Sequence, residues 1–435
     1  MNAAGGRRIH WRLAFLGLGY IGLCYASLLL QSDIQLVVRY FLGLDFKEFY
    51  DAAHVYLAGG NPYEVARFVT PPASLLPNLL LAPFDFYTAR DLWCFASVIM
   101  LGAGGMLAAR DAGHRGPDVF LTVAFLFATF PAQMLIERGN IDALVFLLLA
   151  LALVVRPAWL GAMAWALASL IKIYPTLLAP FLWRVHGRRW LLVALAVMAV
   201  VCAAFWRETI AYGPHLIMRA TEQLFEPNLS PVGYFGHGFH VYALAYVALN
   251  LWLDRQLLAR EPTAEVRRFL GGAWVVPMLF FPRDVLAYVG VSLVLTFVAL
   301  DPLEYRLQRW QRIGLALLEG LIMIPTTGLV SVTDEMEWYA LPRVALFLYS
   351  LALVALKLQL LRESGASAPR SAGARQSEGA DAVSDDHRRR QAPLVQRRAR
   401  SRTAAALPAP PATGRSWQVH DMELSPAPRG GPREA

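Results

Sequence analysis

Hydrophobic residues in this chain fall into long runs that are separated by short polar turns. The runs are on the order of 15 to 22 residues long, which suits helices that cross a hydrocarbon core of ~30 Å. Polar and apolar residues do not alternate with a period of two, as they would in the strands of a membrane barrel. The pattern therefore predicts an all-α, polytopic integral membrane protein with roughly 10 to 12 transmembrane helices.

Composition agrees with this membrane interpretation. The 435 residues are 57% hydrophobic and only 17% charged, whereas about a quarter of the residues in a typical soluble protein are charged. The net charge is +8, but residues 362–435 carry 13 basic and 8 acidic side chains and so account for +5 of it. Nucleic acid is therefore not an expected partner, because most of the positive charge belongs to one tail and to membrane topology.

The distribution of arginine predicts the orientation of the chain. Arg7, Arg8 and Arg12 lie at the start of the first apolar run, residues 11–30, so the positive-inside rule places the N-terminus in the cytoplasm. This run is too long for the apolar region of a typical signal peptide, and we expect a retained first span. The loop at residues 31–89 would then be extracytoplasmic.

Residues 160–183 predict a broken helical hairpin. The strongly basic segment 184–189 is expected on the cytoplasmic side, and neither apolar half of 160–183 is long enough to cross the membrane alone. Lys172 would lie near the outer turn of this hairpin. Broken helices are tolerated at membrane depth where they line a cavity.

The composition changes abruptly after Leu361, where Ser, Ala, Pro, Gly and Arg replace the apolar runs. Such a composition cannot bury a hydrophobic core. We therefore predict two parts, a transmembrane domain at residues 1–361 and a disordered, basic cytoplasmic tail at residues 362–435.

The first outer loop contains the spacing of an amphipathic helix, with apolar or aromatic residues at positions 46, 49, 50, 53, 56 and 57. Lys47 and Asp51 can pair across one turn of this helix. Asp45 opens the helix and Glu48 follows three residues later, which is close to a capping box. Asp45 therefore has two interpretations, which are compatible in part. It is an N-cap, or it is a rigidly mounted carboxylate that accepts a proton from an acceptor hydroxyl.

Two predicted turns and the broken hairpin carry further polar side chains. The segment Gly59-Gly60-Asn61-Pro62-Tyr63 has the chemistry of a turn, and Glu137-Arg138-Gly139-Asn140 forms an outer turn between apolar runs. Arg138 either pairs with Glu137 or Asp142, or supplies positive charge to a ligand. Lys172 likewise either extends to the membrane interface or supplies such charge.

Three stretches resemble a known family. The pattern D-F-x-x-F-Y-x-A-A-x-x-x-L-x-G-G-x-P-Y runs from Asp45 to Tyr63 and is followed by Pro71-Pro72. Gly139-Asn140 opens an apolar run, and Lys172-Ile173-Tyr174-Pro175 precedes another. Together they resemble glycosyltransferase family 87, whose members are membrane enzymes of the GT-C class, similar to polyprenol-phosphate-mannose-dependent α-mannosyltransferases. The resemblance covers roughly residues 10–360.

The resemblance implies a GT-C-like fold that uses a polyprenyl-phosphate-linked hexose, with mannose suggested, on the extracytoplasmic side of the cytoplasmic membrane. The acceptor would be a glycan or glycolipid, and membrane lipids would surround the enzyme. Asp45 matches the catalytic base expected in the family. Positive charge from Arg138 and Lys172 would stabilise the departing phosphate. The full set of expected substrate-binding residues is Glu48, Tyr50, Asn61, Tyr63, Arg138, Asn140, Lys172 and Tyr174.

No metal or cofactor is expected. His54, His215, His237 and His240 do not have the spacing of metal ligands. The chain contains no glycine-rich phosphate loop and no soluble nucleotide-binding domain, which favours a lipid-linked donor over a nucleotide sugar.

Two other classes of function are weighed against the transferase. A transporter or flippase of lipid-linked sugars should have halves with related hydropathy and paired broken helices. The second half of this chain has no counterpart of residues 45–72, and this asymmetry favours an enzyme. A non-catalytic scaffold of a glycan assembly complex is the third class.

Overall fold

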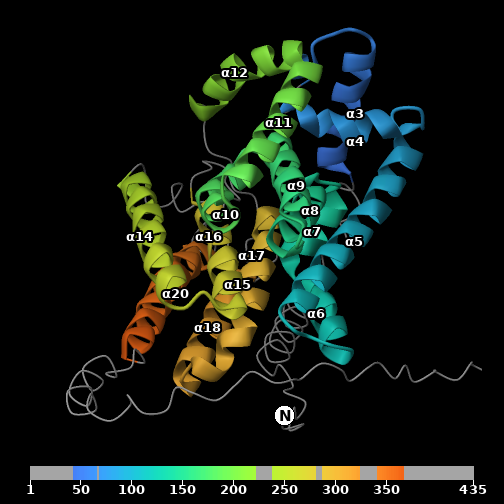
Figure 1. Cartoon of the computed structure of the whole chain (residues 1–435). Helices are drawn as coiled ribbons and strands as arrows, with labels where there is room; N and C mark the ends of the chain where they lie inside the picture. Colours follow the sequence, from blue (N-terminus) through green and yellow to red (C-terminus); the bar gives the residue numbers. More distant parts are fainter. Residues whose placement is uncertain (1–42, 66–67, 222–237, 281–286, 324–339, 367–435) are drawn as a thin grey trace, which may run out of the picture. The chain divides into compact units, whose positions relative to one another are not determined.

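The computed structural model describes residues 43–65, 68–221, 238–280, 287–323 and 340–366. Within these ranges the chain forms helices joined by short connections, and no β-strand is present (Figure 1). The protein is thus an all-α, polytopic membrane protein, as its hydrophobic pattern predicted. The expected first span at residues 11–30 lies outside the described residues.

The helices of the first half are mostly short, and several are interrupted. Their bounds are α3 Leu44–Leu57, η1 Pro62–Glu64, η2 Pro72–Ser74, α4 Leu75–Leu81, α5 Phe86–Asp111, α6 Pro117–Ala128, α7 Phe130–Arg138, α8 Asp142–Val154, α9 Ala158–Ile171, η3 Tyr174–Leu178, α10 Ala179–His186, α11 Arg188–Ala204 and α12 Trp206–Thr221.

The second half has two long helices with shorter pieces between them. Their bounds are α14 Gly238–Arg260, α15 Ala264–Ala273, α16 Val275–Met278, η4 Ala287–Ser292, α17 Leu293–Leu300, η5 Asp301–Arg306, α18 Arg309–Ile322 and α20 Ala340–Ala366.

Two helices in the described part of the chain are long and apolar enough to cross a membrane alone. They are α5 and the segment Pro342–Gly365 of α20. Two bent pairs bring the number to four if each pair is one broken span, since α6 and α7 meet at 64° and α11 and α12 at 96°. The expected total of roughly 10 to 12 crossings stays a prediction, because these helices belong to the described residues only.

The bend between α6 and α7 has a local cause. Thr129 caps α7, and its hydroxyl accepts a hydrogen bond from the Ala132 amide at 3.4 Å. Pro131 follows at the start of α7, where its missing N–H is not needed. A cap followed by a proline starts a new helix instead of continuing the previous one.

Small residues allow the apolar helices to pack closely. In the first half, α5 packs against α8, α8 against α9, and α9 against α11. A Cβ atom added to Gly104 of α5 would lie 2.7 Å from the ring of Phe146 in α8. In the second half, a Cβ on Gly272 of α15 would lie 2.5 Å from that of Ala299 in α17. Such small contact positions are typical of helices that associate in a membrane.

Helix α3 begins differently from what the sequence predicted. Its N-cap is Gly43, which has φ of 75° and whose amide donates to the Glu137 carbonyl at 2.7 Å. Asp45 lies inside the first turn and its side chain makes no capping bond. The capping interpretation of Asp45 is therefore wrong, whereas the pairing of Lys47 with Asp51, at 2.6 Å, is confirmed.

The predicted break in residues 160–183 is confirmed, whereas the return of the chain as a hairpin with Lys172 at its outer turn stays a prediction. Helix α9 ends at Ile171, and Lys172 is extended, with φ of −140° and ψ of 142°. The chain then restarts with η3 and α10. The Trp165 indole donates to the Pro175 carbonyl at 2.8 Å, which holds the two sides of the break together.

Helices α14 and α20 are joined by a fully buried ion pair. The Lys357 ammonium donates to Asp254 at 2.7 Å and to the side-chain oxygen of Asn250 at 2.6 Å. The second carboxylate oxygen of Asp254 accepts from the Trp274 indole at 2.6 Å. Because each charged atom has a partner, this buried pair is satisfied and fixes how the helices meet.

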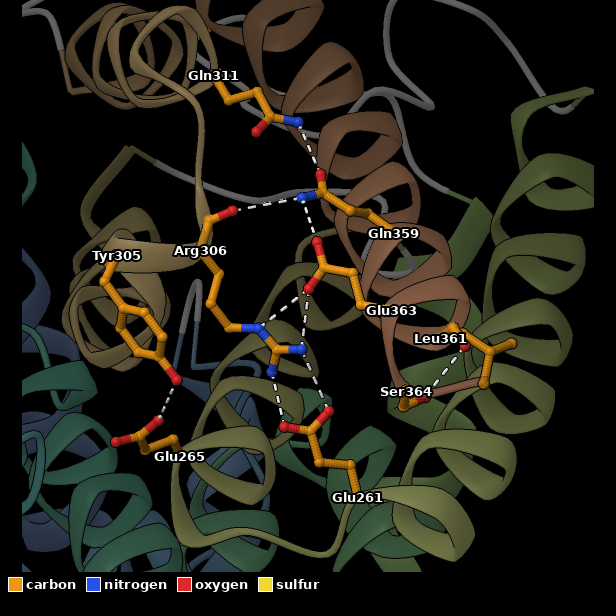
Figure 2. Close-up of polar contacts among 9 residues, drawn as sticks. All are labelled: Glu261, Glu265, Tyr305, Arg306, Gln311, Gln359, Leu361, Glu363 and Ser364. Atoms are coloured by element: carbon orange, nitrogen blue, oxygen red, sulfur yellow. Dashed lines mark hydrogen bonds and ion pairs between the residues drawn. The ribbon is translucent and has the colours of Figure 1, made fainter. Parts of the chain in front are cut away.

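A second polar group, the Arg306 cluster, consists of Glu261, Arg306, Gln311, Gln359 and Glu363 (Figure 2). The guanidinium bonds to Glu261 at 2.7 Å and to Glu363 at 2.9 Å. Gln359 donates to the other oxygen of Glu363 at 2.9 Å. Helix α20 passes Leu361 and continues to Ala366, so Glu363 belongs to a helix and not to an unstructured tail.

Candidate active site

Asp45 is held by two side chains from the turn between α7 and α8. The Arg138 guanidinium donates to Oδ1 of Asp45 from Nε at 2.9 Å and from Nη2 at 2.5 Å. The Asn140 amide donates to Oδ2 at 2.6 Å. Asp45 is buried, and both of its oxygens accept hydrogen bonds. Arg138 therefore pairs with Asp45, a partner that the sequence did not predict.

Gly139 allows the turn between α7 and α8 to approach α3 closely. It ends α7 with φ of 65°, a left-handed conformation that glycine adopts without steric cost. A Cβ atom at this position would lie 2.8 Å from that of Phe46 in α3. The Trp93 indole of α5 donates to the Gly139 carbonyl at 2.8 Å. The turn is thus fixed against two other helices.

Asn140 connects Asp45 to a second buried carboxylate. Its side-chain oxygen accepts from the Asp142 amide at 3.0 Å, at the start of α8. The Asp142 carboxylate is fully buried, and its Oδ1 accepts a short hydrogen bond from the Tyr174 hydroxyl. The Lys172 ammonium lies 3.5 Å from Oδ2 of Asp142, and this oxygen has no hydrogen bond within the described residues.

These contacts form one group, here called the Asp45–Asp142 network. It joins α3, the turn between α7 and α8, and the break after α9, which are far apart in the sequence. Its six members are Asp45, Arg138, Asn140, Asp142, Lys172 and Tyr174. Five of the six were expected to be site residues from the sequence.

Asp142 was missed as a site residue and considered only as a partner for Arg138. A signal was present, because a carboxylate that opens an apolar run is costly in a membrane protein and usually has a function or a partner. The Gly139-Asn140 turn directly before it was a second signal, since that turn was already predicted to face the site.

The network presents its cations outward and its carboxylates inward. The side chains of Arg138 and Lys172 are 22% and 19% exposed, whereas those of Asp45 and Asp142 are 8% and 0% exposed. An anionic ligand that approaches from outside would therefore meet the two cations first. Guanidinium and ammonium groups are the usual protein partners of phosphate.

The other four expected residues lie outside the network. Glu48 is half-buried on α3, and the Tyr50 hydroxyl donates to the Phe84 carbonyl at 2.8 Å, which ties α3 to the start of α5. Asn61 accepts a hydrogen bond from the Tyr63 amide at 3.1 Å. Asn61 and Tyr63 follow the C-terminal end of α3, and Tyr63 belongs to the 3-10 helix η1 that comes after it. A role for these four residues in substrate binding stays a prediction.

Asn61 and Tyr63 belong to a different local environment. Asn61 lines a cavity of about 610 Å³ together with Trp206, Arg207 and Glu208. The Tyr63 hydroxyl donates to the Thr70 carbonyl at 3.3 Å. Burial, with smaller contributions from neighbouring ionisable groups, raises the pKa of Tyr63 well above its usual value. Its hydroxyl therefore remains a hydrogen-bond donor at any physiological pH.

Potential metal ligands do not gather in the part of the chain that the structure describes. No three His, Cys, Asp or Glu side chains lie close enough there to hold an ion. The two network carboxylates bond to Arg138, Asn140 and Tyr174 instead.

Comparison with known proteins agrees with the resemblance seen in the sequence. The model of glycosyltransferase family 87 matches residues 68–323, which is more than half of the chain. The matched region contains Arg138, Asn140, Asp142, Lys172 and Tyr174, and it begins after Asp45. No curated protein matches the chain.

Proposed function

Because the chain belongs to glycosyltransferase family 87, we propose that this membrane glycosyltransferase moves a hexose from a polyprenyl-phosphate donor to a glycan or glycolipid acceptor. Mannose is the proposed hexose, and the proposed location of the active site is the extracytoplasmic side of the cytoplasmic membrane. The observation that carries this proposal is the Asp45–Asp142 network, in which two partly exposed cations contact two buried carboxylates.

The cations suit the donor. When the bond between the sugar and the phosphate breaks, negative charge collects on the leaving phosphate, and preorganised cations lower the energy of that state. Arg138 and Lys172 are the two cations of the network, and both side chains are partly exposed. A donor carried by a polyprenyl chain also suits a site whose supporting helices are mostly apolar.

The contacts of Asp45 lead to a proposal for how it becomes a base. Oδ1 of Asp45 is occupied by Arg138, so it can accept a proton only after that contact opens. The donor phosphodiester also carries one negative charge, and its two free oxygens can compete with the carboxylate for the guanidinium. We therefore infer that donor binding moves Arg138 to the phosphate and uncovers Oδ1, while Asn140 continues to hold Oδ2.

The proposed chemical step is a displacement at the anomeric carbon of the donor sugar. The acceptor hydroxyl oxygen forms a bond to the anomeric carbon, and the bond from that carbon to the phosphate oxygen breaks. The hydroxyl proton goes to Asp45, and polyprenyl phosphate leaves with the bonding electrons. A single displacement of this kind inverts the anomeric configuration. Asp142 acts as a positioning residue, because it holds Lys172, Tyr174 and, through its amide, Asn140.

Label transfer tests the proposal directly. Purified full-length protein in liposomes would be incubated with radiolabelled polyprenyl-phosphate mannose or glucose and an extract of membrane lipids and glycans. We expect label in the acceptor fraction from the polyprenyl donor, and none when a nucleotide sugar replaces it. Folded protein that transfers label from no polyprenyl-phosphate sugar would contradict the proposal.

The sidedness of the site has its own test. Gly60 is proposed to be extracytoplasmic, and Arg188 is proposed to be cytoplasmic because basic residues concentrate around it. Reporter fusions after these two residues should report opposite sides of the membrane. The same side at both positions would contradict the proposed location of the site.

A further inference from the structure

A cavity of about 340 Å³ lies at the opposite end of α8 from the Asp45–Asp142 network. It is lined by residues from the C-terminal ends of α5, α8, α10 and α17 and from α15. Helix α8 runs from Asp142 in the network to Val154 at the cavity, a length of about 20 Å at 1.5 Å per residue. The cavity is therefore a second site, separate from the network.

The rim of this cavity carries excess positive charge. Arg156, Arg267 and Arg268 line it, and among the described residues Asp111 is the one acidic residue that does so. Arg268 donates to Asp111 at 2.6 Å, so its charge is balanced. Arg156 is exposed and has no acceptor within the described residues. Arg267 bonds with Nε and Nη2 to the Pro262 carbonyl, which is neutral. Two arginines thus remain without a counter-ion in this part of the chain.

The position of Arg267 favours an anion further. It lies near the N-terminal end of α15, where the helix dipole adds partial positive charge. A cation at that end is unfavourable unless a negative group compensates it. The opposite holds for Arg156, which follows the C-terminal end of α8 and is stabilised by the helix dipole there. Glu265 in the first turn of α15 already suits the dipole there, so the case for a ligand at Arg267 rests on its missing counter-ion within the described residues.

The floor of the cavity is apolar. Ala108, Ala150, Leu153, Phe181 and Val298 line it, and none of them can hydrogen-bond through its side chain. A soluble anion would use the arginines and leave this floor in contact with water. A molecule with a phosphate head and a hydrocarbon body would fill both parts, and bilayer lipids have that structure.

We propose that this cavity binds an anionic phospholipid of the surrounding bilayer, with its phosphate at Arg156 and Arg267 and the start of an acyl chain against the apolar floor. Basic pockets between transmembrane helices on the cytoplasmic side are suited to such headgroups. The positive-inside rule predicts that side for this end of α8, because Arg110, Arg115 and Arg156 cluster near it.

Native mass spectrometry of the full-length protein tests the proposal. The probe is phosphatidylglycerol, and phosphatidylcholine and inorganic phosphate serve as comparison ligands. We expect the protein to retain phosphatidylglycerol about tenfold more strongly than phosphatidylcholine, since the excess arginines favour a net negative headgroup. The double variant Arg156→Gln/Arg267→Gln should lose that preference.

Three further variants separate the possible outcomes. Arg188→Gln/Arg189→Gln removes the same charge from exposed positions outside the cavity and should leave lipid retention unchanged. Ala108→Leu fills the floor and should weaken phosphatidylglycerol although both arginines remain. Arg156→Gln alone breaks no contact within the described residues, so it remains a valid test if the double variant fails to fold.

Three results would overturn the proposal. The first is wild-type retention of phosphatidylglycerol in Arg156→Gln and in the double variant. The second is equal retention of phosphatidylcholine by the wild-type protein. The third is complete displacement of the lipid by an equal concentration of inorganic phosphate, which would show that the arginines bind a free anion and the floor binds nothing.

Discussion

The Asp45–Asp142 network and the Arg306 cluster use the same kinds of side chain and differ in how completely those side chains are bonded. Each places an arginine against carboxylates from remote segments, with Arg138 22% exposed and Arg306 14% exposed. In the Arg306 cluster, one guanidinium reaches Glu261 and Glu363, and Gln359 takes the remaining oxygen of Glu363 (Figure 2). In the network, Oδ2 of Asp142 has no hydrogen bond within the described residues.

Lys172 shows the same contrast. An ammonium group can donate three hydrogen bonds, but the one polar contact of the Lys172 ammonium within the described residues is with Asp142 at 3.5 Å. A satisfied cluster gains little by binding another molecule, whereas a partly satisfied one has donors to offer. The comparison therefore supports the proposal that the Asp45–Asp142 network binds a ligand, whereas the Arg306 cluster joins helices to one another.

Replacement of Asp45 by Asn should have the largest effect. The Asn side chain cannot take up the proton of the acceptor hydroxyl, so the transfer rate should fall by roughly 100-fold or more. Activity would be measured at matched levels of folded protein, with the melting temperature of each variant determined in detergent. Near wild-type turnover would remove Asp45 from the proposed catalytic role.

Asp85 provides a matched control for that replacement. It is a true N-cap, because its Oδ1 accepts from the Tyr87 amide at 3.0 Å and the Thr88 amide at 3.1 Å. Asn caps a helix about as well as Asp. Asp85→Asn should therefore leave both activity and melting temperature almost unchanged. A large loss there would show that any Asp→Asn change near this loop is harmful.

The contrast between these two aspartates shows what local sequence can predict. Asp45 and Asp85 both stand near helix starts, and only Asp85 is a cap. Gly43 adopts a left-handed conformation and bonds to the Glu137 carbonyl, so α3 starts before Asp45 and leaves its carboxylate for a tertiary contact. A residue 93 positions away decides the role of Asp45, and capping patterns contain no information over that distance.

The individual helices and turns were easier to predict than the contacts between them. The apolar runs and turn residues predicted the break around Lys172 and the turn at Gly139, because each depends on nearby residues. The ends of α14 and α20 were harder to place, since Asp254 and Lys357 satisfy each other inside helices that composition alone would end or interrupt. A charged residue that is paired inside a helix looks, in the hydropathy pattern, like the end of that helix.

Replacement of Lys172 should have the second-largest effect. Without its ammonium the proposed donor phosphate loses one cation, so the KM for donor should rise about tenfold in Lys172→Met, in line with the loss of a charge-assisted hydrogen bond. Lys172→Arg keeps the charge and should restore part of this loss. Initial rates over a range of donor concentrations would measure both.

Two results would contradict the role of Lys172 as a phosphate partner. One is an unchanged KM for donor in Lys172→Met. The other is equal impairment of the Met and Arg variants with a lowered melting temperature in both, which would indicate that Lys172 serves only to neutralise buried Asp142.

Replacement of Arg306 by Gln should affect stability and not chemistry. The cluster loses its charge-assisted hydrogen bonds, and partial exposure to water moderates the cost, which should be about 1 to 2 kcal/mol. Chemical denaturation in detergent would measure this change. Activity per folded molecule should stay at the wild-type level. Arg309→Gln is the control, since Arg309 is exposed and makes no polar contact within the described residues.

Shortening the chain should have the smallest effect, and its size should depend on the chosen end. Residues beyond Ala366 have a composition that cannot form a core, so a chain ending at Ala366 should match the full-length protein in activity and melting temperature. A chain ending at Leu361 also loses Glu363, one of the two carboxylates on Arg306. It should stay active but melt slightly lower, by less than Arg306→Gln, because the pair with Glu261 remains at 2.7 Å. Full-length Glu363→Gln should reproduce that small shift.

If the chain ending at Ala366 were folded but inactive, the tail would have a part in transfer that its composition does not reveal. If the chain ending at Leu361 lost as much stability as Arg306→Gln, Glu261 alone could not hold the Arg306 cluster together.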